Sequence, residues 1–179
     1  MPQFRKIADH QVFEGTLIRL SDAEFEGPGG ERFHRDVVHH PGAVVVVPLG
    51  SDGRVTMVRQ FRAAIEEDIL ELPAGKRDVD GEPTEVTAGR ELAEEVGLRA
   101  GRLDLLARFY NSPGFTDELS WLYLATDLSP VPSDRQGAEE QVMTIEEIQL
   151  ASVPAMIEDG RIVDAKSIIG LLLALNRAD

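Results

Sequence analysis

The chain of 179 residues is 42% hydrophobic and 28% charged, the proportions of an ordinary soluble globular protein. Its formal net charge of −14 argues against binding duplex DNA or anionic lipid through a large basic surface, although a few arginines and divalent cations can still hold a small phosphate-bearing substrate. Because the chain contains no cysteine, disulfides, thiolate metal sites and cysteine nucleophiles are excluded.

The length allows one globular core, with room for a small appendage. The N-terminal stretch MPQFRKIADHQVF lacks the apolar core of a signal peptide, and no run of about 18 apolar residues is present that could span a membrane. We therefore expect a cytoplasmic protein whose partners include neither membrane nor nucleic acid.

Residues 1–40 alternate short β-like runs with polar turns. The cluster GPGG at residues 27–30 separates two of these runs and predicts an antiparallel hairpin or a three-stranded ribbon. A ribbon of this size cannot bury its own apolar face. We expect it to lean on the main domain, residues 41–179, or on another subunit.

From Gly42 onward, strand-like and helix-like segments are interspersed. AVVVVPL, residues 43–49, is a continuous apolar run typical of a strand covered on both faces. We predict the other strands at 54–62, within 69–75, and at 103–110, 120–126 and 141–145, and helices at 83–96, 153–160 and 164–177. Asp164 suits the N-cap of the last helix. The pattern predicts an α/β fold with a mixed sheet between helices.

The helix predicted at 83–96 carries many carboxylates. Pro83 suits its first turn and Gly97 its C-terminal stop. At about 100° per residue, one broad face contains the apolar and small residues Val86, Ala88, Gly89, Leu92, Ala93 and Val96. The other face contains the charged residues Arg90, Glu91, Glu94 and Glu95. We expect the first face to bury against the sheet, so that the carboxylates stand on a rigid platform.

Like charges three and four residues apart on a helix repel one another, so the cluster needs an explanation. One explanation is a solvated surface helix in which Arg90 pairs with Glu94. The alternative is a cation site, because clustered carboxylates and the backbone carbonyls of the preceding Pro73–Gly75 turn form a hard-oxygen site suited to Mg²⁺ or Mn²⁺. The cation site is favoured because Glu91 and Glu95 lack a cationic partner one turn away within the helix.

The segment Gly75–Leu98, GKRDVDGEPTEVTAGRELAEEVGL, resembles the Nudix box, G-x5-E-x7-R-E-U-x-E-E-x-G-U with U an apolar residue. Every fixed position of the box is present, namely Gly75, Glu82, Arg90, Glu91, Leu92, Glu94, Glu95, Gly97 and Leu98. One departure is that six residues rather than five separate Gly75 from Glu82, which affects the loop and the role of Glu82 but not the register of the helix. The resemblance extends from about Gly42 to the final helix.

This resemblance implies an α/β/α Nudix sandwich with a mixed β-sheet, and hydrolysis of a nucleoside diphosphate linked to another moiety. It also implies that Glu91 and Glu95 bind Mg²⁺, for which Mn²⁺ can substitute. The carbonyl of Ala74 and the carboxylate of Glu94 are further candidate ligands. Arg90 would orient a glutamate through a charge-assisted hydrogen bond.

Residues outside the box limit the choice among nucleoside diphosphate substrates. SPGFTD, residues 112–117, resembles the SPG-x-[ST]-[DE] segment of ADP-ribose pyrophosphatases and implies substrate contacts by Pro113 and Gly114, although Ser-Pro-Gly alone is merely a turn. The segments RQFR and ELPAG resemble the same subfamily and add Arg62 and Glu71 as substrate-binding candidates. The Arg62 guanidinium can pair with phosphate oxygens, but a surface arginine at a strand end has the same appearance in the sequence.

In related enzymes the N-terminal ribbon is exchanged between two subunits and helps to hold adenine. We therefore expect a homodimer in which Arg35 could reach a ligand across the interface. Phe13, Phe25 or Phe33 could stack on a base, but we expect these aromatic side chains to be buried within the ribbon.

The polar loop at 132–140 ends in adjacent carboxylates. By similarity to ADP-ribose pyrophosphatases, a glutamate of this loop is the general base, and we favour Glu140 over Glu139. A solvated charged loop would carry the same residues.

The predicted function is Mg²⁺-dependent hydrolysis of ADP-ribose, a nucleoside diphosphate sugar, to AMP and ribose 5-phosphate. An enzymatic alternative is hydrolysis of another nucleotide sugar, GDP-mannose or ADP-glucose, with the same metals. An alternative of another class is an ADP-ribose sensor without hydrolysis, but such modules tend to lose the box glutamates that this chain keeps. A purely structural module would leave the glutamate cluster unexplained.

Overall fold

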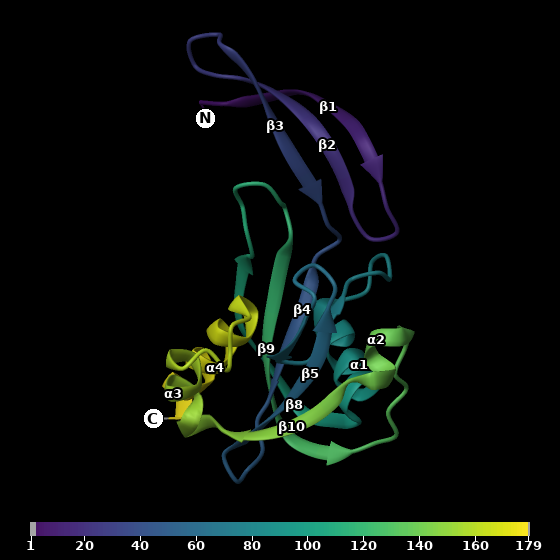
Figure 1. Ribbon diagram of the computed structural model, residues 1–179, viewed down its shortest axis with the longest axis vertical. Helices are drawn as coiled ribbons and strands as arrows, with labels where there is room; N and C mark the ends of the chain where they lie inside the picture. Colours follow the sequence, from purple (N-terminus) through teal and green to yellow (C-terminus); the bar gives the residue numbers. More distant parts are fainter. Residues whose placement is uncertain (1–2, 179) are drawn as a thin grey trace. The chain divides into compact units, whose positions relative to one another are not determined.

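The computed structural model describes residues 3–178 and contains two compact units (Figure 1). One unit contains the chain up to Gly42 together with Phe109–Leu119, and the other contains Ala43–Arg108 and the chain from Ser120 onward. The N-terminal unit therefore includes a segment from the middle of the chain, residues 109–119, that carries the Ser-Pro-Gly turn.

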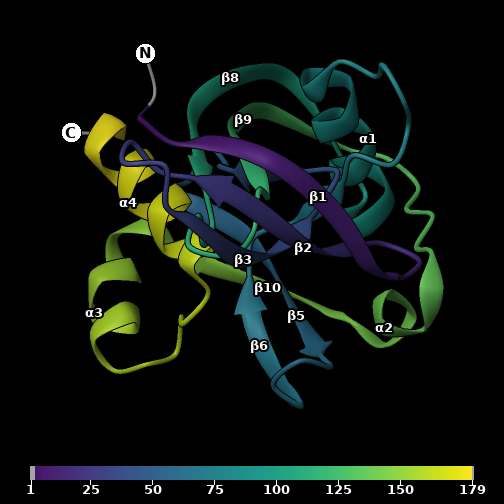
Figure 2. The same ribbon diagram turned by 90° about the horizontal axis from the view of Figure 1, so that it is seen from above.

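The N-terminal unit contains a three-stranded antiparallel ribbon, with strand order β1-β2-β3 (Figures 1 and 2). Its strands are β1 (Arg5–Glu14), β2 (Arg19–Glu26) and β3 (Arg32–His39). β2 and β3 pair without interruption from Arg19↔His39 to Glu26↔Arg32. Of the two predicted arrangements, the three-stranded ribbon is confirmed.

The ribbon aromatics differ in burial. Phe25 and Phe33 lie opposite each other on β2 and β3, and their half-buried rings stack with centroids 5.6 Å apart. Phe13 on β1 is 56% exposed, so the expectation of burial is wrong for this residue.

The second unit contains a mixed four-stranded sheet with strand order β7-β4-β9-β8. Its strands are β4 (Ala43–Pro48), β7 (Ala74–Lys76), β8 (Leu98–Tyr110) and β9 (Leu119–Pro130). β4 is parallel to β9 and antiparallel to β7, which confirms the predicted mixed sheet. A separate antiparallel sheet, in the order β10-β5-β6, is formed by β5 (Arg54–Arg62), β6 (Glu67–Glu71) and β10 (Thr144–Gln149).

Both faces of β4 are covered by helices. Val44 and Val46 share a core cluster with residues of α1 (Thr84–Val96), whereas Val47 points to the opposite side of the strand and meets α4 (Ala165–Ala178) at Gly170. Because successive side chains of a strand point to opposite faces, the valine run is buried on both sides. The predicted helix–sheet–helix sandwich is confirmed.

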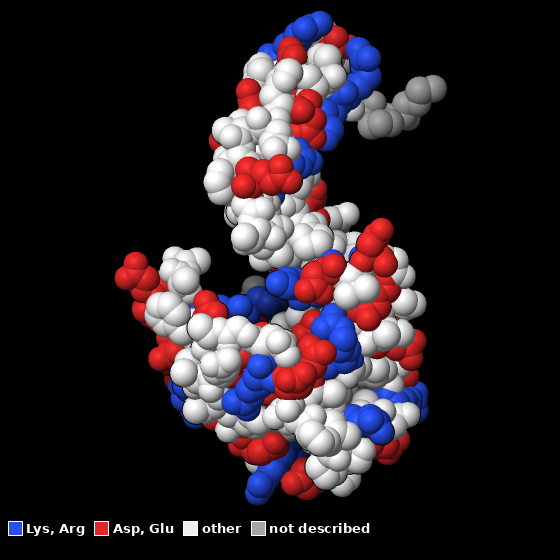
Figure 3. Space-filling view, turned by 90° about the vertical axis from the view of Figure 1, so that its right-hand side faces the viewer, with Lys and Arg blue, Asp and Glu red and all other residues white. Residues whose placement is uncertain are grey.

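The remaining helical segments are α2 (Gly137–Val142), the short 3₁₀ helix η1 (Leu150–Ser152) and α3 (Val153–Glu158), which lies beside α4 (Figures 1 and 2). Within residues 3–178, no helix is long and apolar enough to cross a membrane. Acidic and basic side chains are interspersed on the face shown in Figure 3.

Some predicted boundaries are wrong. The strand predicted at 141–145 is the end of α2 followed by β10, which begins at Thr144. The segment QVMTI is compatible with either structure over so few residues, and the left-handed Gly137, with φ of 81°, starts the helical turn. The strands predicted at 103–110 and 120–126 are longer, extending over 98–110 and 119–130.

Candidate active site

Helix α1 is fixed at both ends. Pro83 is its N-cap, so the helix begins at Thr84, one residue later than predicted. Gly97 is its C-cap, with φ of 67° in the left-handed region that favours glycine. The Gly97 carbonyl accepts a hydrogen bond from the Val131 N–H at 2.8 Å, and an added Cβ at this position would lie 2.9 Å from the Val131 oxygen. The predicted helix stop is confirmed, and only glycine suits it.

Two of the α1 carboxylates are buried. Glu91 is 8% exposed and Glu95 is 3% exposed, whereas Val86, predicted to lie on the buried face, is 53% exposed. The prediction that Glu91 and Glu95 project from the face opposite the core is therefore wrong. A helical wheel separates apolar from charged residues, but here the buried stripe of the helix includes both carboxylates.

The backbone of β7 provides the space for these carboxylates. The Ala74 N–H donates to Glu95 Oε2 at 3.1 Å, and a Cβ added at Gly75 would lie 1.9 Å from Glu91 Cδ. The conformation of Gly75 is not the constraint; its missing side chain is. The Pro73–Gly75 segment therefore lies directly against the two glutamates. Ala74 contacts Glu95 through its N–H group, and the role of its carbonyl as a metal ligand stays a prediction.

Burial changes the acidity of both groups. Burial raises the pKa of Glu91 to about 7, with Arg90 opposing this effect, and burial raises the pKa of Glu95 to about 8, opposed by the Ala74 N–H. Glu140 contributes a smaller upward shift to the pKa of Glu95. A carboxylate in such surroundings is most stable as an anion when a positive charge is adjacent.

Arg90 supplies part of that positive charge. Its Nη1 lies 2.9 Å from Glu91 Oε1 and 3.0 Å from Glu94 Oε2, and its Nη2 lies 3.4 Å from Glu82 Oε2. Asp78, from the lengthened loop, lies 3.6 Å from the same nitrogen. The extra residue therefore does not prevent Glu82 from reaching Arg90. The Arg90–Glu94 pair exists, but in a cluster around a half-buried arginine rather than on a solvated helix.

The donor set fits a magnesium ion. In the part of the chain that the structure describes, no three Asp, Glu or His side chains are assembled as a complete metal site. Mg²⁺ is usually held by one or two carboxylates together with substrate phosphates rather than by an all-protein cage. Glu91 and Glu95, two buried oxygen donors one helical turn apart, match that mode of binding.

Arg62, at the end of β5, is held by a buried carboxylate of the neighbouring strand β6. Glu71 is 2% exposed, and its Oε2 accepts from Arg62 Nε at 2.6 Å and from Gln60 Nε2 at 3.1 Å. Lys166 Nζ, on α4, lies 3.8 Å from the other Glu71 oxygen. The prediction that Glu71 contacts substrate disagrees with this burial. Its position is that of a residue that orients Arg62.

A pocket brings Arg62 together with the carboxylates of α2. Its volume is about 370 Å³, and it is lined by Gln60–Ala64, Glu139 and Glu140. Glu140 Oε2 accepts from the Gln136 N–H at 2.7 Å. The two glutamates that the sequence leaves as alternatives for the base therefore both line the pocket that contains the predicted phosphate-binding arginine.

Arg135 is a residue that the sequence reasoning missed. Its Nε donates to the Glu95 carbonyl at 3.0 Å, and its Nη1 donates to the Met143 carbonyl at 2.8 Å. Its side chain thus ties the end of α1 to the end of α2, next to Glu140. The only signal in the sequence is a single cation in an acidic loop, which does not reveal its partners.

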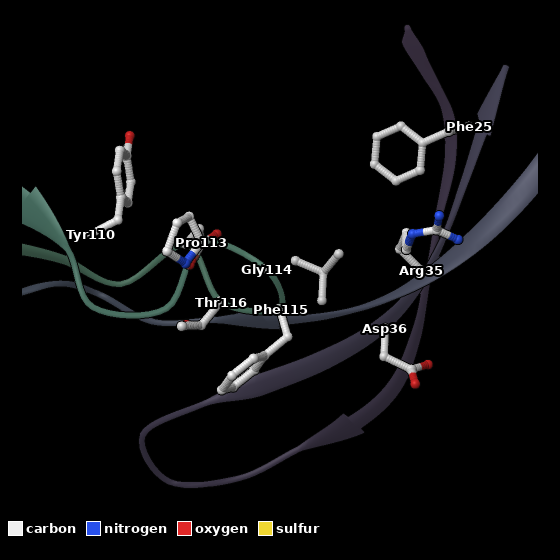
Figure 4. Close-up of a pocket in the computed structure, with 10 residues that line it drawn as sticks. Phe25, Arg35, Asp36, Tyr110, Pro113, Gly114, Phe115 and Thr116 are labelled. Carbon is white, nitrogen blue, oxygen red and sulfur yellow. The ribbon is translucent and has the colours of Figure 1, made fainter. Parts of the chain in front are cut away.

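The other substrate-binding candidates lie in the N-terminal unit. A pocket of about 320 Å³ there is lined on the ribbon side by Phe25, Arg35, Asp36 and Val37, and on the loop side by Tyr110 and residues 113–117. Figure 4 shows Arg35 and Phe25 on the ribbon strands and Pro113 on the loop. The structure thus brings Arg35, Pro113 and Gly114 to one cavity.

Comparison with known proteins identifies the family. The model of the NUDIX domain matches residues 38–166. This chain belongs to the NUDIX domain family. The Nudix chain is 39% identical over 163 residues to the ADP-ribose pyrophosphatase of Bacillus subtilis (strain 168), an alignment covering 91% of this chain and 88% of that protein.

A second relative of this Nudix protein is the methanol dehydrogenase activator of Bacillus methanolicus, 36% identical over 167 residues, with 93% of this chain and 90% of that protein covered. Among solved structures, an ADP compounds hydrolase matches with a TM-score of 0.85 at 23% identity, over 99% of this chain and 95% of that chain. This structural match shows that the two proteins share a fold.

Proposed function

We propose that this Nudix protein hydrolyses the diphosphate bond of ADP-ribose, giving AMP and ribose 5-phosphate. The observation that carries the proposal is the burial of Glu91 and Glu95 beside Gly75, because two buried carboxylates need a cation and a diphosphate needs its charge neutralised. The 39% identity to an ADP-ribose pyrophosphatase favours ADP-ribose among the diphosphates.

The metal-binding groups in this proposal are the carboxylates of Glu91 and Glu95, with Glu94 and the Ala74 carbonyl as further ligands. When bound, Mg²⁺ neutralises diphosphate oxygens and makes phosphorus more open to attack; Mn²⁺ can replace it. Arg90 orients Glu91 and Glu94 through the contacts of its Nη1.

A second set of groups contacts the substrate and the attacking water and does not bind the metal. The Arg62 guanidinium, oriented by the hydrogen bond of its Nε to Glu71, donates to phosphate oxygens. Glu140 removes the proton of the attacking water, and Glu139 is the alternative base. Both glutamates line the same pocket as Arg62, which supports this assignment.

The N-terminal pocket receives the nucleoside part in this proposal. Arg35, Pro113 and Gly114 would contact it, and the half-buried Phe25 ring offers a flat apolar surface. We also propose that the active protein is a cytoplasmic homodimer. The exposed apolar side chains of the ribbon, Val12 and Phe13 among them, support the dimer.

The test is hydrolysis of a panel containing ADP-ribose, ADP-glucose and GDP-mannose, with and without Mg²⁺, in ¹⁸O-labelled water. We expect kcat/KM for ADP-ribose to exceed the others by about tenfold or more, with the label on a product phosphate. A higher kcat/KM for GDP-mannose would make GDP-mannose the proposed substrate in place of ADP-ribose. Binding of ADP-ribose without cleavage would indicate a sensor. If the protein neither bound nor cleaved any member of the panel, the proposal would be overturned and a role exerted on another protein would be favoured.

A further inference from the structure

His39, the last residue of β3, contacts the loop that carries the Ser-Pro-Gly turn. Its Nδ1 lies 2.6 Å from Asp117 Oδ2. The other oxygen of the same carboxylate accepts the backbone N–H of His40 at 2.9 Å. Asp117 therefore uses both oxygens to bind the end of β3.

Backbone hydrogen bonds join the same two segments. The Val38 N–H donates to the Phe115 carbonyl at 2.7 Å, and the Asp117 N–H donates to the Val38 carbonyl at 3.1 Å. The loop between β8 and β9 is thus fastened to β3 over residues 115–117. This is the stretch that forms the loop wall of the N-terminal pocket.

The second ring nitrogen of His39 faces another strand. Its Nε2 lies 3.4 Å from Asp9 Oδ2 on β1, and it is buried and without a hydrogen bond to any of residues 3–178. Lys6 and Arg19 contact the same Asp9 carboxylate, at 2.8 and 3.7 Å. The imidazole therefore lies between two carboxylates, one on β1 and one on the loop, at the end of β3.

We propose that His39 is a positioning residue for the substrate: its contacts to Asp117 and Asp9 hold the 112–117 loop on the ribbon, so that Pro113 and Gly114 keep the wall of the pocket in place. The substrate part of this inference rests on the proposed function. His39 does not line the pocket itself, so it acts through the loop.

The chain contains a matched control for the experiment. His34 is also on β3, and its Nδ1 lies 2.8 Å from Asp22 Oδ1, but this pair joins β3 to β2 and does not involve the loop. His34→Asn therefore removes a histidine–aspartate contact within the ribbon, whereas His39→Asn removes the contacts to Asp117 and Asp9. Only His39→Asn frees the loop.

With ADP-ribose and Mg²⁺, we expect His39→Asn to raise KM about tenfold, equivalent to about 1.4 kcal/mol of binding, while kcat stays within about twofold of wild type. His34→Asn should leave both constants unchanged. Asp117→Asn should raise KM similarly, and the double variant His39→Asn/Asp117→Asn should be no worse than either single variant. Equal KM values for His39→Asn and His34→Asn, or parallel losses of kcat and melting temperature, would overturn the proposal.

Hydrogen–deuterium exchange tests the loop contact without any substrate. We expect peptides covering 111–118 to exchange faster in His39→Asn and Asp117→Asn than in His34→Asn, while peptides covering β4 are unchanged. Equal exchange in all three variants would overturn the inference. If the wild type failed to cleave ADP-ribose but the loop exchanged faster in these two variants, the proposed function would fall and the loop-holding role of His39 would stand.

Discussion

Glu95 shows at the scale of one residue how the site departs from stability rules. It is 3% exposed and burial raises its pKa to about 8, an effect opposed by the Ala74 N–H and by the charge of Arg62. A buried anion is costly unless it is paired or bound to a metal. We therefore expect the Glu95 carboxylate to bind a cation rather than to stabilise the fold.

Glu95→Gln tests this view. The amide oxygen can still accept from Ala74, and a neutral amide costs less to bury than a carboxylate, so the variant should unfold at no lower temperature than wild type in the absence of divalent cations. Its kcat should fall by several orders of magnitude. Differential scanning fluorimetry with and without Mg²⁺, combined with ADP-ribose hydrolysis, measures both effects.

Glu85→Gln is the control, because Glu85 is an exposed carboxylate in the first turn of the same helix. Near-normal turnover of Glu95→Gln at saturating Mg²⁺, or a loss of activity in Glu85→Gln of the same size, would contradict the assignment of Glu95.

At the scale of elements, the close approach of β7 to α1 depends on Gly75. In Gly75→Ala the new methyl group would overlap the Glu91 side chain, since the added Cβ lies 1.9 Å from Glu91 Cδ. We expect weaker Mn²⁺ binding, measured by electron paramagnetic resonance, and a large loss of hydrolysis. Unchanged Mn²⁺ affinity would show that metal binding does not depend on the space that Gly75 leaves for the Glu91 side chain.

Gly89→Ala is the matched variant on α1. The nearest atom to its added Cβ is Leu103 Cδ1 at 3.8 Å, an ordinary contact. Alanine in a helix interior is favoured over glycine by about 0.5 to 1 kcal/mol, so this change should stabilise the protein and preserve Mn²⁺ binding.

Asp164 links the start of α4 to the stability of the fold at low pH. Burial raises its pKa, but the Lys166 ammonium and Ser167 outweigh burial and hold the pKa below the ordinary 3.8. Its Oδ2 accepts from the Ser167 N–H at 2.9 Å, which confirms the predicted N-cap. Because the folded pKa is the lower one, the stabilisation is complete well above pH 3.8 and is lost as the pH falls through the folded value.

Urea unfolding as a function of pH tests this linkage. Asp164→Asn retains a capping oxygen but loses the charge, so its deficit in unfolding free energy should be largest near neutral pH and should shrink below pH 3.8. Asp164→Ala should cost about 1 kcal/mol through loss of the cap. Asp68→Asn, at an exposed site on β6, controls for the removal of one negative charge. A deficit that stays constant with pH would contradict the lowered pKa of Asp164.

The elements that the sequence predicts well are those with a repeated pattern or a strong end signal. The valine run of β4, the Gly97 stop and the Asp164 cap need only local information. The strand predicted at 141–145 is wrong because the short segments of the α2–β10 region show no lasting period and few buried side chains. Met143 is buried, but α2 has no buried residue. Patterns of four to six residues do not separate helix from strand.

At the scale of the whole molecule, resemblance to the Nudix box gives candidate residues for the site but not their surroundings. Fixed positions identify Glu91 and Glu95, whereas their burial depends on Gly75 of another element. The Arg62–Glu71 pair, the Arg135 contacts and the His39–Asp117 pair each join residues from different elements. No local pattern encodes such partners, because each contact exists only after the chain has folded.

Exposed apolar side chains of the ribbon bear on the oligomeric state of the protein. The ribbon is a three-stranded sheet with exposed apolar side chains, among them Val12 at 64% and Phe13 at 56%. Exposed apolar side chains gathered on one small sheet mark a surface for contact with another protein chain. We therefore predict a dimer in sedimentation equilibrium, and Val12→Lys/Phe13→Lys should shift it toward monomer. A fully active wild-type monomer would contradict this prediction.

The most direct test of the central claim is a crystal structure of the protein with Mn²⁺ and a non-cleavable ADP-ribose analogue. We predict anomalous density for manganese at about 2.0 to 2.3 Å from carboxylate oxygens of both Glu91 and Glu95, with the analogue's diphosphate completing the coordination. An analogue bound elsewhere, with these two carboxylates bare of metal, would contradict the account.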